Sequence, residues 1–197
     1  MDGIELPELT DGRLRLRPPE DRDVARITAL CQDVEVQRWT RVPVPYTEDD
    51  AHRFVQFSSD RLGDGTGVHL VVVSAGVDAG SGAGVGSDVV LGATGLDIDR
   101  RDLSAELGYW VAPDARRQGV ATRSSRLLLR FAFDELDLGY VGLWAAADNV
   151  ASNAVARSLG FTFEGTARDA TLLGIPGEPD RVRGDVNRWG IRPQELT

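Results

Sequence analysis

The sequence contains no lysine: all 22 of its basic residues are arginines, against 31 acidic residues. The resulting formal net charge is −9 at pH 7. The phosphate backbone of nucleic acids repels a chain with this excess of negative charge, so we expect no nucleic-acid partner. The same balance favours partners that carry amines.

Cysteine is almost absent as well, and Cys31 alone excludes an intrachain disulfide framework. No apolar run approaches the roughly 20 residues that cross a bilayer, and residues 1–13 lack the basic and apolar blocks of a signal peptide. We therefore expect a cytoplasmic protein with no membrane role. His52 and His69 lack the paired spacing of metal ligands, so we also expect no metal.

A chain of 197 residues is long enough for one well-buried core, which predicts a single domain over residues 1–197 with its core at about 13–191. Hydrophobic patterning predicts strands from residue 13 and at 68–74, 89–99, 105–112, 140–147, 161–170 and 181–191, and helices at 20–33, 45–62, after 119 and at 149–160. Glycine and serine at 75–88 predict a flexible hairpin excursion. This order predicts an α/β fold with a mixed sheet and helices on both faces.

One stretch, "ELGYWVAPDARRQGVATRSSRLLLRFAF", runs from an expected strand through a short loop into an amphipathic helix. Gly119 and Ala121 let an anion approach the first backbone amides of that helix, where the helix dipole is positive. Arg116 and Arg117 add charge-assisted contacts. The sequence lacks the glycine-rich fingerprints of nucleoside triphosphate and dinucleotide sites, so we expect a different diphosphate.

The residues of this loop carry a family resemblance. "RRQGVA" resembles the phosphate-loop signature of the GNAT superfamily of acyl-CoA N-acyltransferases, and "DNVASNAVARSLGFTFEG" resembles its second motif. "LRLRPPEDRDVARI", "ELGYWVAP" and "SLGFTFEG" are similar in particular to the RimJ/RimL-type branch. The resemblance covers nearly the whole chain, and it implies a GNAT-like single domain whose central sheet is mostly antiparallel, splayed and flanked by helices.

The resemblance also implies a function. It predicts an enzyme that moves an acetyl group directly from acetyl-CoA, as co-substrate, to a primary amine of a protein N-terminus or a small molecule. The amides of residues 118–122 would hold the CoA pyrophosphate, and the strand end at Trp110 and Val111 would hold the pantetheine arm. The implied CoA-binding residues are Trp110, Val111, Arg116, Arg117, Gln118, Gly119, Val120, Ala121, Thr122, Asn149 and Ser152. Asn149 also fits a purely structural role as a helix N-cap.

The catalytic residues are less clearly marked in the sequence. Many GNAT enzymes carry a proton-donating tyrosine at the position of Ala156, so the resemblance transfers that role to Ser152. A serine in a first helical turn also serves as a local backbone partner. For the base we consider Glu106 and Asp169, with a structural carboxylate as the alternative reading of Glu106. A CoA-binding protein without efficient transferase activity is therefore the alternative function.

The acceptor site is expected near the segment "QRWTRVPVPYT", interpreted as a loop between the first two helices. Trp39 and Tyr46 would line its wall. A homodimer is compatible with the sequence. We also expect nearby acidic residues to favour a cationic amine over a neutral one, with an ordinary solvated surface as the alternative. These residues are Glu48, Asp49, Asp50, Asp97 and Asp99.

Overall fold

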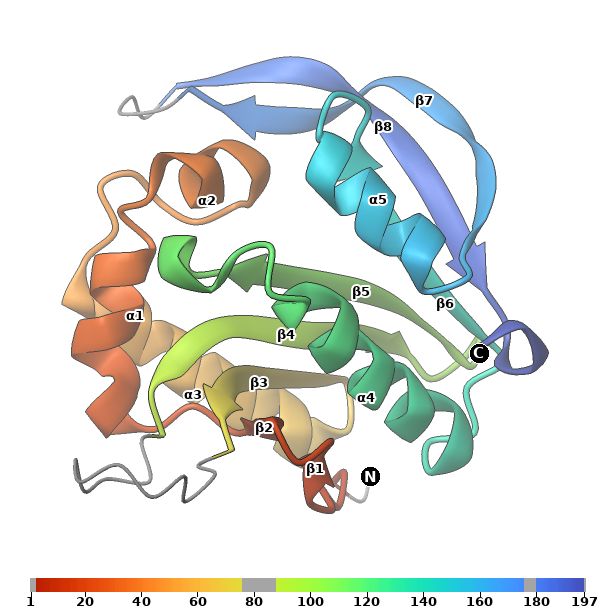
Figure 1. Cartoon of the computed structure of the whole chain (residues 1–197), viewed down its shortest axis with the longest axis horizontal. Helices are drawn as coiled ribbons and strands as arrows, with labels where there is room; N and C mark the ends of the chain where they lie inside the picture. The colour runs from red at the N-terminus through yellow and green to blue at the C-terminus, as the bar shows by residue number, and fades with distance from the viewer. Residues whose placement is uncertain (1–2, 76–87, 176–179, 197) are drawn as a thin grey trace.

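The computed structural model describes residues 3–75, 88–175 and 180–196. The glycine-rich excursion expected at 75–88 lies almost wholly outside these ranges. Within them, eight strands form one sheet in the order β1-β2-β3-β4-β5-β6-β8-β7. Figure 1 shows the sheet opening into two parts, with β5 and β6 at the division. The described strands are β1 (Leu9–Thr10), β2 (Leu14–Arg17), β3 (Gly67–Ser74), β4 (Val90–Asp99), β5 (Ser104–Val111), β6 (Tyr140–Ala146), β7 (Thr162–Gly174) and β8 (Arg181–Ile191).

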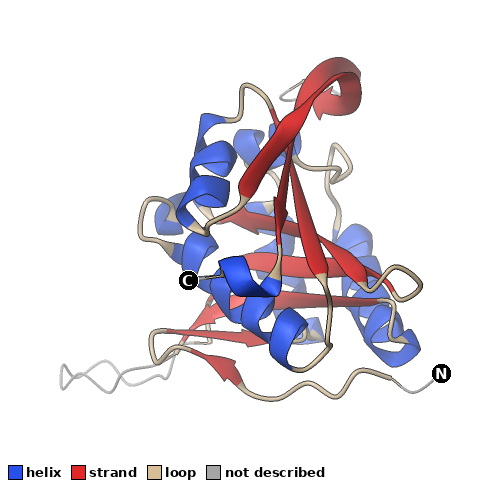
Figure 2. Cartoon of the chain, turned by 90° about the vertical axis from the view of Figure 1, so that its right-hand side faces the viewer, coloured by secondary structure: helices blue, strands red, loops and turns tan. Residues whose placement is uncertain are grey.

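Helices cover both faces of the sheet, as the sequence predicts. In Figure 1, α3 lies behind β3 and β4, whereas α4 crosses in front of the same strands, and Figure 2 shows the strands between the helices from the side. The described α-helices are α1 (Val24–Leu30), α2 (Val34–Trp39), α3 (Glu48–Asp64), α4 (Val120–Asp134) and α5 (Val150–Ser158). No helix in the described ranges has the length and apolar character needed to cross a membrane.

Strand pairing explains why the sheet divides. The described pairs are antiparallel except for β5 with β6, which is parallel. This parallel pair covers only Ser104 to Glu106 on β5, opposite Tyr140 to Gly142 on β6. Beyond Glu106 the two strands separate, while each keeps its antiparallel partner on the outer side. The expected fold class, a mostly antiparallel splayed sheet flanked by helices, is therefore confirmed.

The region between the first two expected helices differs from the sequence prediction. A short helix, α2, occupies Val34–Trp39, so Trp39 ends a helix and the loop starts at Thr40. Asp33 caps α2 by accepting from the amides of Glu35 and Val36. This helix is not predicted from the sequence, because its six residues are too few to show a clear helical period.

The start of α3 follows its predicted signal. The Thr47 hydroxyl accepts from the Asp50 amide at 3.3 Å, and the Asp50 carboxylate accepts from the Thr47 amide at 2.9 Å. This reciprocal pair is a capping box, which satisfies two amides at the helix entrance. Asp50 therefore has a local structural role, and Glu48 and Asp49 lie in the first turn, where negative charge complements the helix dipole.

Candidate active site

The fork between β5 and β6 holds two pockets, one on each side of the separated strands. The first, named the α4 pocket, has a volume of about 490 Å³ and is lined by residues 35–36, 39–40, 109–111, 115–117, 119–122, 149, 151–152 and 155. The second, named the β7 pocket, has a volume of about 360 Å³ and is lined by residues 39–41, 54, 69, 93–95, 97, 106–110, 143–146, 149, 152, 170–173 and 186. The two pockets share Trp39, Thr40, Tyr109, Trp110, Asn149 and Ser152.

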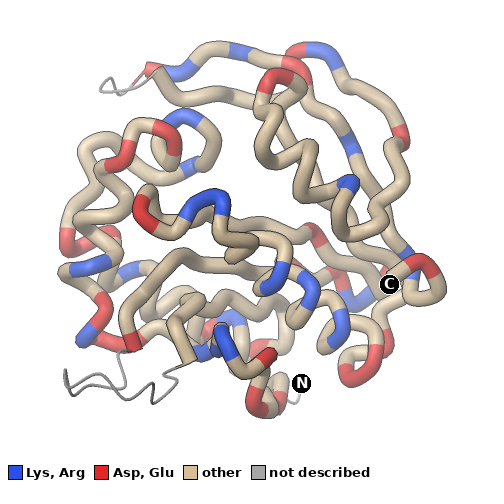
Figure 3. The backbone as a smooth tube through the Cα atoms, in the orientation of Figure 1, with Lys and Arg blue, Asp and Glu red and all other residues tan. Residues whose placement is uncertain are grey.

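The entrance of α4 has the local geometry expected of the predicted anion site. Gly119 is the N-cap with φ +77°, a left-handed conformation that glycine adopts at little cost. No side chain in the described part of the chain caps α4, whereas Asp33, Thr47 and Asn149 cap α2, α3 and α5. The start of α4, with no side-chain cap and with the positive end of the helix dipole, therefore forms part of the wall of the α4 pocket. Figure 3 shows basic residues gathered along this loop and along α4.

The predicted phosphate-binding side chains have different surroundings. Arg116 donates to the carboxylate of Asp33 and, at 3.2 Å, to the carbonyl of Val111, so it joins the end of β5 to the start of α2. Gln118 donates to the Asp114 carbonyl at 2.7 Å and is not among the residues lining the α4 pocket. Arg117 is exposed and lines the pocket. Of the two arginines, Arg117 is thus the more available to an anion.

The outer wall of the β7 pocket comes from the chain after α2 and from the β7–β8 hairpin. Arg181 on β8 donates to the carbonyls of Thr40 and Val42 at 2.9 and 2.8 Å, which ties the hairpin to this segment. Gly174 on β7 passes close to α2, because an added Cβ would lie 2.1 Å from the Gln37 carbonyl oxygen. These contacts fix Trp39 where both pockets meet.

Glu106 stands at the vertex of the fork and lines the β7 pocket. The pocket walls desolvate its carboxyl and raise its pKa above the ordinary value; Arg41 opposes this shift and Asp97 adds to it. A carboxylate with a raised pKa is suited to accept a proton near neutral pH. The position and the electrostatics of Glu106 therefore fit the predicted base.

Asp97, opposite Glu106 in the strand register, already has side-chain partners in Arg61 and His69. Its Oδ1 accepts from Arg61 at 2.6 Å and lies 3.3 Å from Nε2 of His69, and the two partners hold its pKa below the ordinary value. Asp99 instead accepts from the amides of Arg101 and Asp102 in a turn. Of the acidic residues expected to attract a cationic acceptor, only Asp97 lines the β7 pocket.

The start of α5 places two polar side chains where the two pockets meet. Asn149 caps the helix by accepting from the Ser152 amide at 3.0 Å, and it also lines both pockets, so its capping role does not exclude the predicted ligand contact. Ser152 also lines both pockets, whereas Ala156, one turn later, is fully buried and lines neither. The geometry therefore presents the Ser152 hydroxyl at the junction, where the sequence analysis placed a proton donor.

Two further residues at this site were missed in the sequence. Asn153 is 3% exposed and bonds to the carbonyls of Ala146 and Asn149 and to the side chains of Asn187 and Trp189, so it fixes α5 on β6 and β8. Tyr109 on β5 places its hydroxyl 2.9 Å from Ser152 Oγ. Such contacts join residues far apart in the chain, and no local pattern predicts them.

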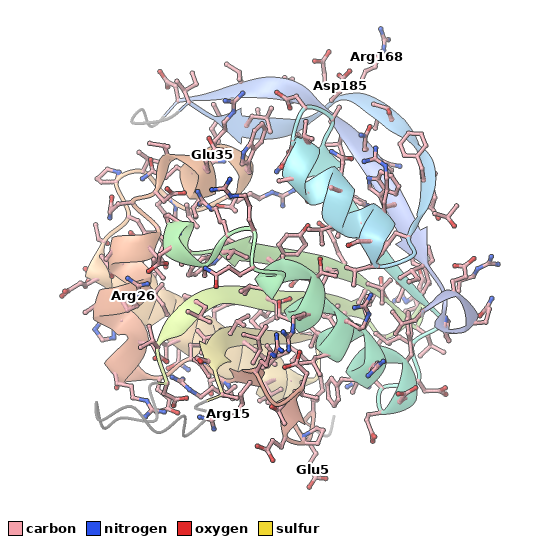
Figure 4. The ribbon with its side chains drawn as sticks, viewed as in Figure 1. Glu5, Arg15, Arg26, Glu35, Arg168 and Asp185 are labelled. Atoms are coloured by element: carbon pink, nitrogen blue, oxygen red, sulfur yellow. The ribbon has the colours of Figure 1, made fainter. Side chains whose placement is uncertain are left out.

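The structure does not bring two predicted site residues to the fork. Tyr46 is 7% exposed, packs in the core and lines neither pocket, because the chain turns it inward before α3. Asp169 is exposed on β7, where its amide donates to Asp185, and it also lines neither pocket. Figure 4 shows the neighbouring Arg168 and Asp185 on the outer side of the hairpin, part-way along it and away from α4.

Acidic, histidine and cysteine side chains do not converge on a metal site in the described ranges, where no group of three or more is close enough to hold an ion. Cys31 is buried at 1% exposure, and burial raises the pKa of its thiol to about 12. It is a core residue, since a thiol at that pKa supplies no thiolate near neutral pH.

A forked mixed sheet, an uncapped helix entrance beside it and a carboxylate at the vertex form a site suited to an anionic ligand beside one strand edge. Comparison with known families identifies the class of protein. The model of the acetyltransferase (GNAT) domain matches residues 13–162, and the chain belongs to this family of acetyltransferase enzymes. The resemblance drawn from the sequence motifs is thus confirmed.

Individual relatives agree with this assignment. The putative ribosomal N-acetyltransferase YdaF of Bacillus subtilis is 41% identical over 77 residues, which is 39% of this chain and 42% of that protein. RimL, a ribosomal L7/L12 alpha-N-protein acetyltransferase solved with coenzyme A, shares the fold with a TM-score of 0.79 at 21% identity, over 94% of this chain and 98% of its own. RimJ of Mycobacterium smegmatis, solved with CoA-disulfide, shares the fold with a TM-score of 0.75 at 20% identity, over 97% of this chain and 88% of its own.

Proposed function

We propose that the protein transfers an acetyl group from acetyl-CoA to a primary amine by direct attack within a ternary complex. The observation that carries this proposal is the junction of the two pockets at the fork, formed by Trp39, Thr40, Tyr109, Trp110, Asn149 and Ser152. A donor in the α4 pocket and an acceptor in the β7 pocket would bring their reacting ends together there. Direct transfer needs this proximity and gains much of its rate from it.

The donor lies along the α4 pocket in this proposal. The pyrophosphate binds the uncapped amides from Gly119 to Thr122, with Arg117 as a charged contact. The pantetheine arm follows the β5 edge at Trp110 and Val111, which β6 leaves unpaired beyond Glu106. CoA and CoA-disulfide in the solved RimL and RimJ structures support this choice of donor.

The chemistry divides between the two sides of the junction. Glu106 accepts the proton that the amine must lose, directly or through water, before its nitrogen attacks the thioester carbonyl. As the carbon–sulfur bond breaks, the electron pair stays on sulfur, and Ser152 protonates the departing thiolate. Asp169 takes no part, because it lines neither pocket.

The acceptor is a primary amine on a peptide N-terminus or a small molecule. The names of YdaF and RimL, which refer to ribosomal N-acetylation and to alpha-N-protein acetylation, support the peptide. The β7 pocket carries Arg41 as well as Asp97 and Glu106, and Asp97 is paired with Arg61. The charge of the pocket therefore gives little support to the expectation that acidic residues favour a cationic amine over a neutral one.

Thiol release from acetyl-CoA, measured with a panel of peptides with free N-termini and small amines, tests the proposal. We expect release that depends on the amine, with mass spectrometry locating one acetyl group on the amine nitrogen. Thermal unfolding with and without acetyl-CoA is measured in parallel. Stabilisation by acetyl-CoA without release for any amine would favour the alternative, a CoA-binding protein without efficient transfer, whereas no stabilisation would refute both.

A further inference from the structure

Tyr109 occupies a position at the site that the proposed mechanism has not used. It lies on β5 three residues after Glu106, in the part of the strand that β6 leaves unpaired, and it lines both pockets. Its hydroxyl oxygen is 2.9 Å from Ser152 Oγ and 3.5 Å from the Ser152 carbonyl oxygen. The residue that would protonate the thiolate is thus hydrogen-bonded across the fork to a phenol.

The other hydrogen bonds of this region limit how the pair is arranged. Asn149 accepts the Ser152 backbone amide, which leaves Tyr109 as the partner of the Ser152 hydroxyl among the described side chains. A serine hydroxyl has one hydrogen to donate and two lone pairs to accept. If the phenol donates to Oγ, the serine hydrogen must point elsewhere. If the phenol instead donates to the Ser152 carbonyl, the serine hydroxyl donates its hydrogen to the oxygen of Tyr109.

The distances and the electrostatics favour the first arrangement. The oxygen–oxygen distance to Oγ is near the optimum for hydroxyl pairs, whereas 3.5 Å to the carbonyl is long. Burial raises the pKa of the Tyr109 phenol to about 12, against an opposing effect of the bond with Ser152, so the phenol keeps its hydrogen near neutral pH. Tyr109 therefore keeps a hydrogen that it can donate at working pH.

We propose that Tyr109 is a positioning residue that acts through Ser152: its hydroxyl donates to Ser152 Oγ and directs the serine hydrogen toward the thioester sulfur at the junction of the two pockets. This inference rests on the proposed acetyl transfer. When the carbon–sulfur bond breaks, the serine proton passes to the thiolate. The Tyr109 proton then moves to Ser152 along the 2.9 Å contact, and water returns a proton to Tyr109. The proton from the amine leaves through Glu106.

The experiment is a double-mutant cycle of Tyr109→Phe and Ser152→Ala, with turnover and KM measured for the donor and the best amine. Tyr109→Phe removes only the hydroxyl and keeps the ring. Tyr140→Phe is the matched control, because the Tyr140 hydroxyl bonds to Glu164 at 2.8 Å and Tyr140 lines neither pocket. Thermal unfolding with and without acetyl-CoA verifies that each variant folds and binds the donor.

We expect Ser152→Ala to lower turnover by about 10²-fold, as loss of a general acid does. Tyr109→Phe should lower turnover about 10-fold, the effect of one well-placed hydrogen bond, with KM for acetyl-CoA and the acetyl-CoA-induced shift unchanged. The double variant should match Ser152→Ala alone, since the phenol has no target once the serine hydroxyl is gone. Tyr140→Phe should retain wild-type turnover.

Three results would overturn the inference while leaving the proposed function in place. These are wild-type turnover in Tyr109→Phe, an equal loss from Tyr109→Phe with and without Ser152, and a Tyr109→Phe variant that loses the acetyl-CoA-induced shift. The second would make Tyr109 act independently of Ser152, and the third would make it a residue needed for binding of the donor. A wild-type protein that binds acetyl-CoA but acetylates no amine would instead refute the proposed function, and this inference with it.

Discussion

Asn153 offers a direct test of how the site is held in place. Its Nδ2 donates to the carbonyls of Ala146 and Asn149 at 2.9 and 2.8 Å, and its Oδ1 accepts from Asn187 and Trp189 at 2.9 and 3.0 Å. The substitution Asn153→Leu keeps the number and branching of the side-chain heavy atoms and removes all four bonds. Both carbonyls keep a backbone partner, so the main unsatisfied group is the indole N–H of Trp189, which is 4% exposed.

The expected loss follows from these bonds. A typical hydrogen bond contributes about 1 kcal/mol net, and a buried donor without a partner costs about 1–3 kcal/mol. Because the leucine side chain gains some apolar burial, we expect the free energy of unfolding to fall by about 3 kcal/mol. In urea, with a slope of about 2 kcal/mol/M, the midpoint should fall by about 1.5 M with the slope unchanged.

A double-mutant cycle with Trp189→Phe isolates the unsatisfied indole. Trp189→Phe should lower the free energy of unfolding by at least about 1 kcal/mol less in the Asn153→Leu background than in the wild type. The reason is that Trp189→Phe removes the indole N–H that Asn153→Leu leaves without an acceptor. Two results would refute the reasoning: additive losses of unfolding free energy in the double variant, or a loss from Asn153→Leu below about 1 kcal/mol. Turnover should fall as well, since Asn153 positions the helix that carries Ser152.

Two predictions concern the binding and chemistry at the fork. Gly119→Val should remove the stabilisation by acetyl-CoA, about 2.7 kcal/mol at a hundred times its dissociation constant in the wild type, because a β-branched residue disfavours the left-handed backbone of the anion loop. Gly12→Val, at φ +83° with open space around it, controls for strain, and an undiminished shift in Gly119→Val would contradict the binding site. Glu106→Gln should lower turnover by about 10²-fold. Burial raises the pKa of Glu106, so wild-type kcat/KM should fall as the pH drops through a value above 4.5, where Glu106 becomes protonated. This fall at acidic pH should disappear in Glu106→Gln but persist in the control Glu164→Gln. An acidic limb that survives in Glu106→Gln would assign the base to another group.

Local signals in the sequence determined a large part of this protein. The capping box at Thr47, the Asn149 cap and the Gly119 loop lie where their residues predict, because each depends on hydrogen bonds or backbone angles within a few residues. The family motifs are local signals of the same kind, since "RRQGVA" determines the backbone at the start of α4. The class of protein and its mostly antiparallel sheet therefore followed from the sequence.

The tertiary structure decided which side chains meet. The separation of β5 from β6 after Glu106 depends on the pairing of both strands with their outer neighbours, and this choice turns a strand edge into two pockets. Tyr109 and Ser152 are 43 residues apart in the chain and meet only across this fork. Tyr46 and Asp169 have residue types as suitable as those that do line the pockets, but packing buries one and the twist of the hairpin carries the other away. Local patterns cannot encode such distances, because they arise from the packing of all the elements together.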